Sequence, residues 1–216
     1  MFSLVLLAVV CFLLGSIPWG LIISKSVFHT DIREHGSGNI GTTNAMRTMG
    51  KKGGVAVFVL DFGKGLLSGL IALFVLATFI PGAGVAADSP ASASTVVALA
   101  FLFCTLGHIF SPWLKFKGGK GIAVAAACLV FVFGPLGFLI EIAVFALGIA
   151  VTRCVSVGSI AAAVICPVLA LYFYWGQWVP WLIIAATACV VIWAHRANIA
   201  RLRAGTENKI GSKKTA

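Results

Sequence analysis

Residues 122–152, IAVAAACLVFVFGPLGFLIEIAVFALGIAVT, decide the fold of this chain. The run is too long for one membrane crossing, which takes about 20 residues of helix. Gly134-Pro135-Leu136-Gly137 interrupts it near its middle. Proline and glycine end helices and favour turns, so the stretch predicts two short membrane segments joined at this point.

Apolar runs on either side predict the remaining spans. The chain is 60% hydrophobic and 10% charged, whereas a soluble domain has about a quarter of its residues charged. The predicted fold is an all-α integral membrane protein of about seven transmembrane helices, forming one domain over residues 1–216. The other spans are 1–24, 53–80, 93–114, 155–175 and 178–194, with a Gly/Ala/Ser/Pro connection at 81–92.

The distribution of lysine and arginine predicts the topology. With seven spans all basic connections fall on one side, which the positive-inside rule assigns to the cytoplasm, so the N-terminus is expected outside and the C-terminus inside. The net charge of +10 then reflects topology and contact with anionic membrane lipid, and nucleic acid is not an expected partner. The basic connections are 25–52, 115–120, Arg153 and the tail 195–216, whereas those at 81–92, 134–137 and 176–177 carry no Lys or Arg.

The chain shows no signature of a signal peptide, disulfide framework or metal centre. No charged residue precedes Lys25, so the first apolar run is expected to remain as a span. The six cysteines are scattered without a CxxC pair, which predicts buried thiols. No HEXXH motif or carboxylate cluster is present, so no metal and no other cofactor is expected.

The polar loop GSGNIGTTNAMR at 36–47 is the strongest functional signal. Its backbone N–H groups and the planar, permanently charged Arg47 side chain suit a phosphate or another anion. The alternative is an ordinary interhelical loop in which Thr42, Thr43 or Asn44 caps a helix. The density of glycines together with Arg47 favours the anion site.

Two further polar clusters lie on the same predicted face. KGGKG at 117–121 precedes an apolar helix, so its N–H groups and Lys120 suit a phosphate, with a flexible basic anchor as the alternative. His195 and Asn198 are three residues apart and share a face if the last helix continues. The alternative there is a solvated basic helix end.

Three charged residues lie inside the predicted spans. Asp61 and Lys64 are three residues apart and predict either a structural ion pair or a lysine that reaches into the site. Glu141 is expected near the outer end of its segment, where its side chain would reach the membrane interface.

Together these clusters resemble the signatures of bacterial glycerol-3-phosphate acyltransferases that use acyl phosphate, the small integral-membrane Y-type family. The resemblance implies a multi-pass enzyme of the bacterial cytoplasmic (inner) membrane with its active site on the cytoplasmic face. Such an enzyme transfers an acyl chain from acyl phosphate to the 1-hydroxyl of glycerol 3-phosphate, giving lysophosphatidate and phosphate, in the first acylation step of phospholipid synthesis. The matching motifs are GSIPWG at 15–20, DIR at 31–33, the loop 36–47, LD at 60–61 with KG at 64–65, the segment 107–121, HRANIARL at 195–202 and GTE at 205–207.

The same resemblance carries residue roles onto this chain. It implies catalytic roles for Ser37, Arg47, Lys120, His195 and Asn198, and a structural role for Glu207. The predicted substrate and phosphate contacts are Gly36, Gly38, Asn39, Gly41, Thr43, Asn44, Lys64, His108, Ser111, Gly118, Gly119, Gly121, Ser156 and Ser159.

The predicted mechanism follows from what such a site must hold. Both substrates carry phosphate, so the site needs two anion-binding positions, for which Arg47, Lys120 and loop amides are candidates. None of the four histidines is followed by aspartate in a His-x4-Asp pattern. We therefore expect direct attack by the glycerol hydroxyl, helped by positioning and charge neutralisation, with a substrate phosphate oxygen as a candidate proton acceptor. A covalent acyl-Ser37 is the weaker alternative.

Other functions are left open by the sequence. A transporter of an organic phosphate is disfavoured because no inverted repeat is visible and the polar clusters lie on one face. A scaffold that only binds anionic lipid leaves Ser37, Asn39, Thr43 and Asn44 unexplained. Among enzymes, coenzyme A or an acyl carrier protein is the alternative donor.

Overall fold

The computed structural model describes residues 2–80 and 92–211, and every regular element in these ranges is a helix. The predicted all-α class is confirmed. Residues 81–91 of the predicted connection lie outside the described part of the chain. The elements are α1 (Phe2–Ser16), α2 (Trp19–Ser26), η1 (Ile32–Glu34), α3 (Thr42–Thr48), α4 (Gly50–Phe79), α5 (Ala93–Ile109), η2 (Pro112–Leu114), α6 (Ile122–Thr152), α7 (Val155–Phe173), α8 (Trp178–Ala194) and α9 (Arg196–Arg203).

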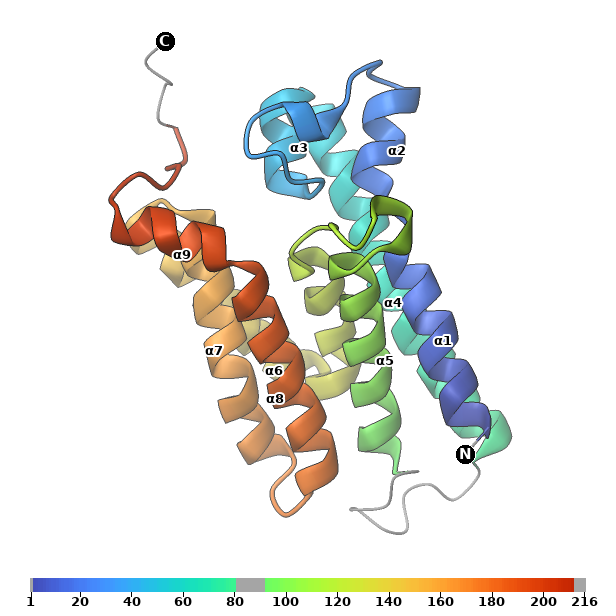
Figure 1. Ribbon diagram of the computed structural model, residues 1–216. Coiled ribbons are helices and arrows are strands. Elements are labelled where there is room, and N and C mark those ends of the chain that lie inside the picture. The colour runs from blue at the N-terminus through green and yellow to red at the C-terminus, as the bar shows by residue number, and fades with distance from the viewer. Residues whose placement is uncertain (1, 81–91, 212–216) are drawn as a thin grey trace.

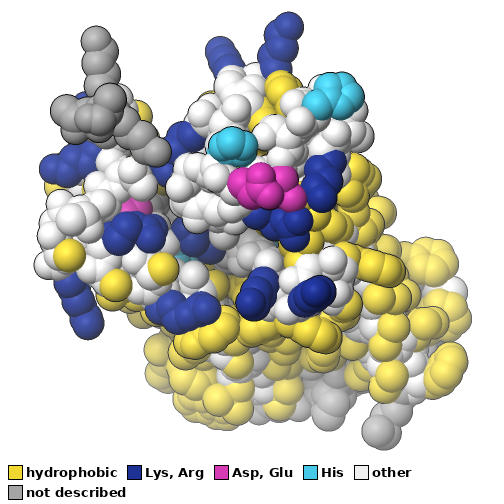
Figure 2. All heavy atoms as spheres, turned by 45° about the horizontal axis from the view of Figure 1, so that its top comes forward, with side chains coloured by type: hydrophobic (Ala, Val, Ile, Leu, Met, Phe, Trp, Pro, Cys, Tyr) yellow, Lys and Arg dark blue, Asp and Glu magenta, His cyan; other side chains and the backbone are white. Residues whose placement is uncertain are grey.

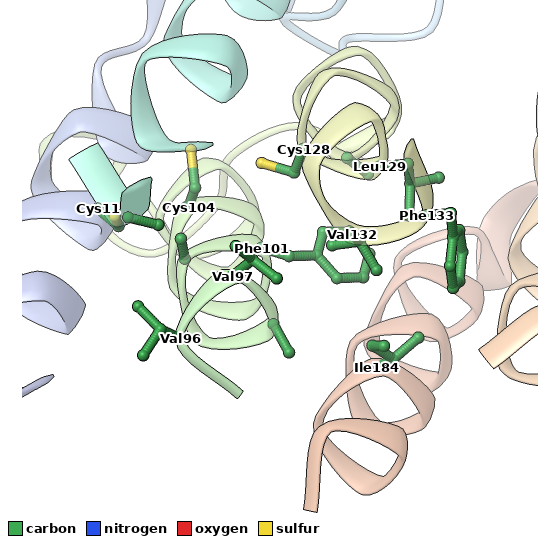
Figure 3. Packing of buried hydrophobic residues seen from close by; sticks show 14 of the residues in the cluster. Cys11, Val96, Val97, Phe101, Cys104, Cys128, Leu129, Val132, Phe133 and Ile184 are labelled. Atoms are coloured by element: carbon green, nitrogen blue, oxygen red, sulfur yellow. The ribbon is translucent and has the colours of Figure 1, made fainter. Parts of the chain in front are cut away.

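The long helices form a bundle, with α2, α3 and α9 gathered at one end (Figure 1). Within it α1 packs on α4 and α5, α6 packs on α4 and α7, and α8 packs on α5 and α7. Side chains such as Phe101, Val132 and Ile184 meet in the core, and the thiols of Cys11, Cys104 and Cys128 lie among them (Figure 3). All six cysteines are free thiols and five are buried, as predicted, while Cys189 is exposed.

Helix α6 reverses direction at Gly134, where the sequence predicts a break. Gly134 has φ 65° and ψ −173°, which is outside the helical region and suits a residue without a Cβ. Before the break α6 runs parallel to α4, because Gly65 lies against Val124 and Gly69 against Phe131. After it, α6 runs antiparallel to α7.

The antiparallel course of the second half follows from its contacts with α7. Gly137 lies beside Phe173 near the end of α7, and Gly148 lies beside Gly158 near its start. Residues 122–133 make a helix about 18 Å long, which is shorter than the apolar layer of a membrane, about 30 Å. The turn at Gly134 therefore lies within the depth of the bundle.

The membrane character of the fold is clear, whereas the number of crossings stays a prediction. Five helical stretches are long and apolar enough to span, or up to six if the bent pair α8–α9 is one span. Counting the two halves of α6 separately would give the predicted seven. Lys and Arg side chains gather over one end of the bundle, and hydrophobic side chains cover its sides (Figure 2). Which side of the membrane that end faces also stays a prediction.

The first predicted span is broken by Pro18, which separates α1 from α2. A proline at this position leaves carbonyl groups of the preceding turn without their helical N–H partners. Two distant side chains satisfy them: the Ser111 hydroxyl donates to the Ser16 carbonyl at 2.6 Å, and the Lys64 ammonium donates to the Ile17 carbonyl at 2.9 Å. The break in the first helix is therefore stabilised by α4 and by the segment after α5.

Lys64 is the centre of a buried polar network that joins three helices. Its ammonium also lies 2.9 Å from an Asp61 carboxylate oxygen and 2.9 Å from Nδ1 of His108. Lys64, Asp61 and His108 are each at most 4% exposed. Because the ammonium can only donate, Nδ1 of His108 accepts, and the ring carries its proton on Nε2. The predicted Asp61–Lys64 ion pair is confirmed.

Loss of the Lys64 charge should destabilise the protein strongly. Lys64→Met leaves Asp61 buried without its ion-pair partner, and such a change costs about 3–5 kcal/mol. The double variant Asp61→Asn/Lys64→Met should recover part of this loss, because it leaves no buried charge. The measurement is the free energy of unfolding in mixed micelles during a detergent titration. A Lys64→Met protein within about 0.5 kcal/mol of wild type would show that the network is not structural.

Candidate active site

A cavity of about 680 Å³ opens among the helices α3 to α9. At the end of the bundle where the basic segments gather (Figure 2), its wall carries Arg47, Lys120 and Arg201. Further into the bundle the wall is almost entirely apolar, formed by residues such as Phe101 and Leu129. One end therefore suits an anion and the rest suits a hydrocarbon chain.

The polar loop before α3 is held in shape by Asn44. Its amide nitrogen donates to the carbonyls of Ile32, His35 and Asn39 at 2.9–3.1 Å. Its amide oxygen accepts the N–H of Ser37 at 2.9 Å. The Asn44 side chain is thus used within the loop, although the residue lies in the cavity wall. Asn44 therefore acts as a scaffold for the loop, and its predicted substrate contact stays a prediction.

The glycines of this loop act on its shape. Gly36 and Gly38 have φ of 63° and 69°, a region that disfavours residues with a Cβ, and a Cβ on Gly36 would collide with Asn44. Neither glycine lies in the cavity wall, and the predicted substrate contacts of Gly36 and Gly38 stay predictions. No threonine caps α3, because its N-cap is Gly41 and no side chain bonds there.

The loop before α6 also uses backbone N–H groups within the fold. The N–H groups of Gly118 and Gly119 donate to the carbonyls of Ile109 and His108 at 2.9 and 3.0 Å, so they are not available to a phosphate. Gly119 also packs on the His108 ring, where a side chain would collide. Both residues allow the loop to pack against α5, and their predicted substrate contacts stay predictions.

The side chains of Lys64 and Ser111 also bond within the fold. Lys64 has its three donors engaged by Asp61, His108 and the Ile17 carbonyl. Ser111 is fully buried and bonds to Ser16. Neither residue lies in the cavity wall, and their predicted substrate contacts stay predictions. His108 does line the cavity, and so does its neighbour Asp61.

Lys120 is the cation whose environment is most perturbed. Burial, followed by repulsion from Arg201, lowers the pKa of Lys120 from 10.5 to about 8, with Glu207 opposing and Arg47 adding to the shift. The repulsion shows that cations from α3, the α6 loop and α9 converge on one place. Helix α6 begins in the cavity wall with Ile122 and Ala123, and N–H groups of a first helical turn have no partner within the helix. This end of the cavity therefore has the charge and donors for a phosphate.

The third cluster sits at a bend between α8 and α9. The predicted continuous helix is not observed, since the two helices meet at 55° around His195. Both His195 and Asn198 still line the cavity. Nδ1 of His195 lies 2.8 Å from the Val191 carbonyl, which can only accept, so Nδ1 carries the proton and Nε2 is an acceptor when the ring is neutral.

Glu207 connects the tail to α9. Its carboxylate accepts a hydrogen bond from the Asn198 amide at 2.9 Å and one from Arg201 Nε at 2.8 Å. The side-chain oxygen of Asn198 is buried and has no partner among the described residues, and the same holds for the hydroxyls of Thr42 and Ser156. These unpaired polar atoms belong to residues that line the cationic end of the cavity, and buried polar groups normally have partners.

Most of the predicted site thus comes together around one cavity. The predicted residues in its wall are Ser37, Asn39, Gly41, Thr43, Asn44, Arg47, His108, Lys120, Gly121, Ser156, Ser159, His195, Asn198 and Glu207. The residues that we did not predict include Thr42, Arg201 and Asn208. Arg201 is three residues after Asn198, so the helical spacing used for His195 and Asn198 would have found it.

Glu141 is placed differently from the prediction. It is 3% exposed and lies in the cavity wall deep in the bundle. The expectation that its carboxyl reaches the membrane interface is wrong. The reason is the short first half of α6, which puts the turn at Gly134, and the residues after it, within the bundle.

The comparisons with known proteins agree with this geometry. The family model described as glycerol-3-phosphate acyltransferase matches residues 5–205. A glycerol-3-phosphate acyltransferase of Chlorobaculum parvum is 36% identical, and the alignment covers 97% of each chain. One of Acaryochloris marina is 39% identical over 96% of this chain and 92% of its own.

Two crystal structures of PlsY (YgiH), an integral membrane glycerol 3-phosphate acyltransferase, have the same fold. The glycerol 3-phosphate form superposes with a TM-score of 0.82 at 33% identity, covering 97% of this chain and 96% of that one. The lysophosphatidic acid form gives 0.78 at 32% identity with the same coverage. This chain belongs to the glycerol-3-phosphate acyltransferase family, in its integral-membrane PlsY type.

Proposed function

We propose that the protein transfers an acyl chain from acyl phosphate to the 1-hydroxyl of sn-glycerol 3-phosphate, giving lysophosphatidate and phosphate as the first acylation step of phospholipid synthesis. The observation that carries the proposal is a single cavity with a cationic end and an apolar remainder. An acyl phosphate has the same two parts. The glycerol 3-phosphate and lysophosphatidic acid forms of the related structures support the acceptor and the product.

The cationic end has the groups to hold two phosphates close together. Arg47 offers a planar fork of donors, and Lys120 offers a compact charge. Arg201 is a third cation, and Glu207 holds its guanidinium at 2.8 Å. Neutralising the phosphates removes the repulsion between the substrates and stabilises the charge that develops on the departing phosphate. No cofactor is needed, because the acyl phosphate already has a good leaving group.

The chemical step we propose is direct attack by the glycerol hydroxyl on the acyl carbonyl. The C–O bond to glycerol forms, the C–O bond to phosphate breaks, and the hydroxyl proton passes to a phosphate oxygen. Asn198 has an unpaired side-chain oxygen and His195 has an accepting Nε2, so both suit the positioning of the hydroxyl. Ser37 has an exposed hydroxyl in the wall, which suits a hydrogen bond to a substrate phosphate.

We also propose that the cationic end faces the cytoplasm of a bacterium, across its inner membrane, with residues 1–216 acting as one transmembrane acyltransferase domain. The lysines and arginines that gather there (Figure 2) are the residues that membrane insertion retains on the cytoplasmic side. Glycerol 3-phosphate, a charged and water-soluble molecule, would then enter from the cytoplasm. The acyl chain would occupy the part of the cavity that lies within the membrane.

The donor is tested first. Purified protein is supplied with labelled glycerol 3-phosphate and either palmitoyl phosphate or palmitoyl-coenzyme A, and labelled lysophosphatidate is measured. We expect product only with palmitoyl phosphate. In palmitoyl-coenzyme A the reacting carbonyl carries a thioester, so no phosphate lies beside it to occupy the donor's anion-binding position. Product with palmitoyl-coenzyme A alone would overturn the proposed donor, and no product with either, from folded protein, would overturn the activity.

The role of Ser37 separates direct attack from a covalent route. None of the hydrogen bonds in the described ranges joins the Ser37 hydroxyl to a histidine or a carboxylate, so it lacks an activating base. Ser37→Ala should lower kcat/KM by about 10- to 100-fold, the effect of losing one hydrogen bond to a charged group. Acid-quenched wild-type protein incubated with radiolabelled palmitoyl phosphate should retain no label, and a palmitoylated Ser37 peptide in the mass spectrum would refute direct attack.

The lowered pKa of Lys120 predicts a pH dependence of substrate binding. Only the protonated amine attracts phosphate, so affinity is full below the pKa of about 8 and is lost as the pH rises through it. The KM for glycerol 3-phosphate should rise up to about tenfold per pH unit above this point, while the substrate charge is constant because its second pKa is about 6. In Lys120→Arg the cation does not titrate, so the rise should disappear. A rise of KM that persists in Lys120→Arg would assign it to another group.

A further inference from the structure

The deep end of the cavity holds one carboxyl group. On the second half of α6 the lining residues follow helical spacing along one face, and Glu141 lies on that face. Its side chain is buried, and neither carboxyl oxygen has a hydrogen-bond partner among the described residues. The carboxyl interacts with the thiol of Cys166, which is a weak donor. The lining residues of this stretch are Phe138, Glu141, Ile142, Phe145, Ala146, Ile149 and Ala150.

The depth of Glu141 can be measured along α7. The lining residues of α7 begin with Val155 and Ser156 near the cationic end and finish with Cys166. Ten residues of helix separate Ser156 from Cys166, so Glu141 lies about 15 Å further into the bundle than Ser156. Phe101 is the deepest lining residue of α5, Leu129 that of the first half of α6, and Phe138 lies one helical turn beyond Glu141; all three are apolar. Glu141 therefore places a polar group among apolar side chains in the deep part of the cavity.

An unpaired carboxyl in this position needs a partner. Polar groups within a membrane are costly unless they are solvated or bonded, and they usually mark a function. The described protein atoms supply only the Cys166 thiol, a weak donor, so the rest of the group's hydrogen bonding has to come from the cavity side. A saturated acyl chain long enough to fill the deep end excludes water from that side and leaves the carboxyl without a further partner. A shorter chain leaves room for water.

We propose that Glu141 determines acyl-chain specificity, by making the deep end of the cavity unfavourable to saturated chains that reach it and favourable to chains with a polar group there. This inference rests on the proposed function, since it assumes that the acyl chain enters the apolar part of the cavity. It assigns Glu141 no part in the transfer step. Its effect is on which donors bind and react.

The test compares four proteins over a series of saturated acyl donors from octanoyl to stearoyl. They are the wild type, Glu141→Met, Glu141→Gln and Thr187→Val. The control residue Thr187 is a buried polar residue of α8 outside the cavity wall, whose hydroxyl bonds to the Ile183 carbonyl. The quantity measured is kcat/KM for each donor, divided by the value for octanoyl with the same protein.

We expect Glu141→Met to raise this ratio for the longest chains by about tenfold relative to wild type, the effect of removing one unpaired polar group from the wall. Glu141→Gln keeps a polar group and should keep the wild-type ratio, as should Thr187→Val. A Glu141→Met protein that elutes as folded protein and shows the wild-type ratio would overturn the proposal and leave Glu141 as a structural residue.

A second measurement needs only the wild type and therefore does not depend on the folding of a variant. ω-Hydroxypalmitoyl phosphate carries a hydroxyl that can pair with Glu141, so it should be used at least as well as palmitoyl phosphate. A preference for palmitoyl of about 100-fold, expected for a wholly apolar channel, would overturn the proposal. Both measurements are repeated with the coenzyme A donors. Failure of acyl phosphate as donor then refutes the proposed function, while the chain-length ratio still tests Glu141.

Discussion

The buried ammonium of Lys64 is the interaction on which the rest of the structure depends. It holds the carbonyl that Pro18 releases from α1, the carboxylate of Asp61 on α4 and the ring of His108 on α5. The His108 carbonyl in turn accepts the N–H of Gly119, and Gly119 fixes where Lys120 emerges. A chain of polar contacts therefore runs from a break in the first helix to a cation of the site, and none of its inner members has to touch the substrate.

The site combines two environments that normally exclude each other. Its cations come from three separate elements, α3, the loop before α6, and α9, and burial together with repulsion from Arg201 and Arg47 lowers the pKa of Lys120. Directly beyond them the wall is built from small and aromatic side chains of α5, α6 and α7. The small side chains leave room for the cavity, and the polar loops form its cationic end. This arrangement matches a substrate with a charged head and a long apolar chain.

The sequence was a good guide where the signal is local. Hydropathy predicted the long apolar helices, and the Gly134-Pro135 pair predicted the break within α6. The polar clusters predicted that Ser37, Arg47, Lys120, His195 and Asn198 would lie together, and all five line one cavity. The sequence did not predict hydrogen bonds between residues that are far apart along the chain. The bond between Ser111 and Ser16 joins residues 95 positions apart, and the N–H groups of the glycine loop are taken by carbonyls of α5, which no local pattern reveals. The depth of Glu141 depends on the length of the first half of α6, which ends at Gly134 before it could cross the apolar layer.

The convergence of Arg47, Lys120 and Arg201 concentrates positive charge at one end of the bundle. Each cation belongs to a different element, and no described acidic group other than Glu207 balances them at that place. Like charges repel at short range, so an anion bound among them would reduce this repulsion and favour the arrangement in which α3, the loop before α6 and α9 lie close together. An anion bound at this end would therefore contribute to the stability of the fold as well as occupy the site.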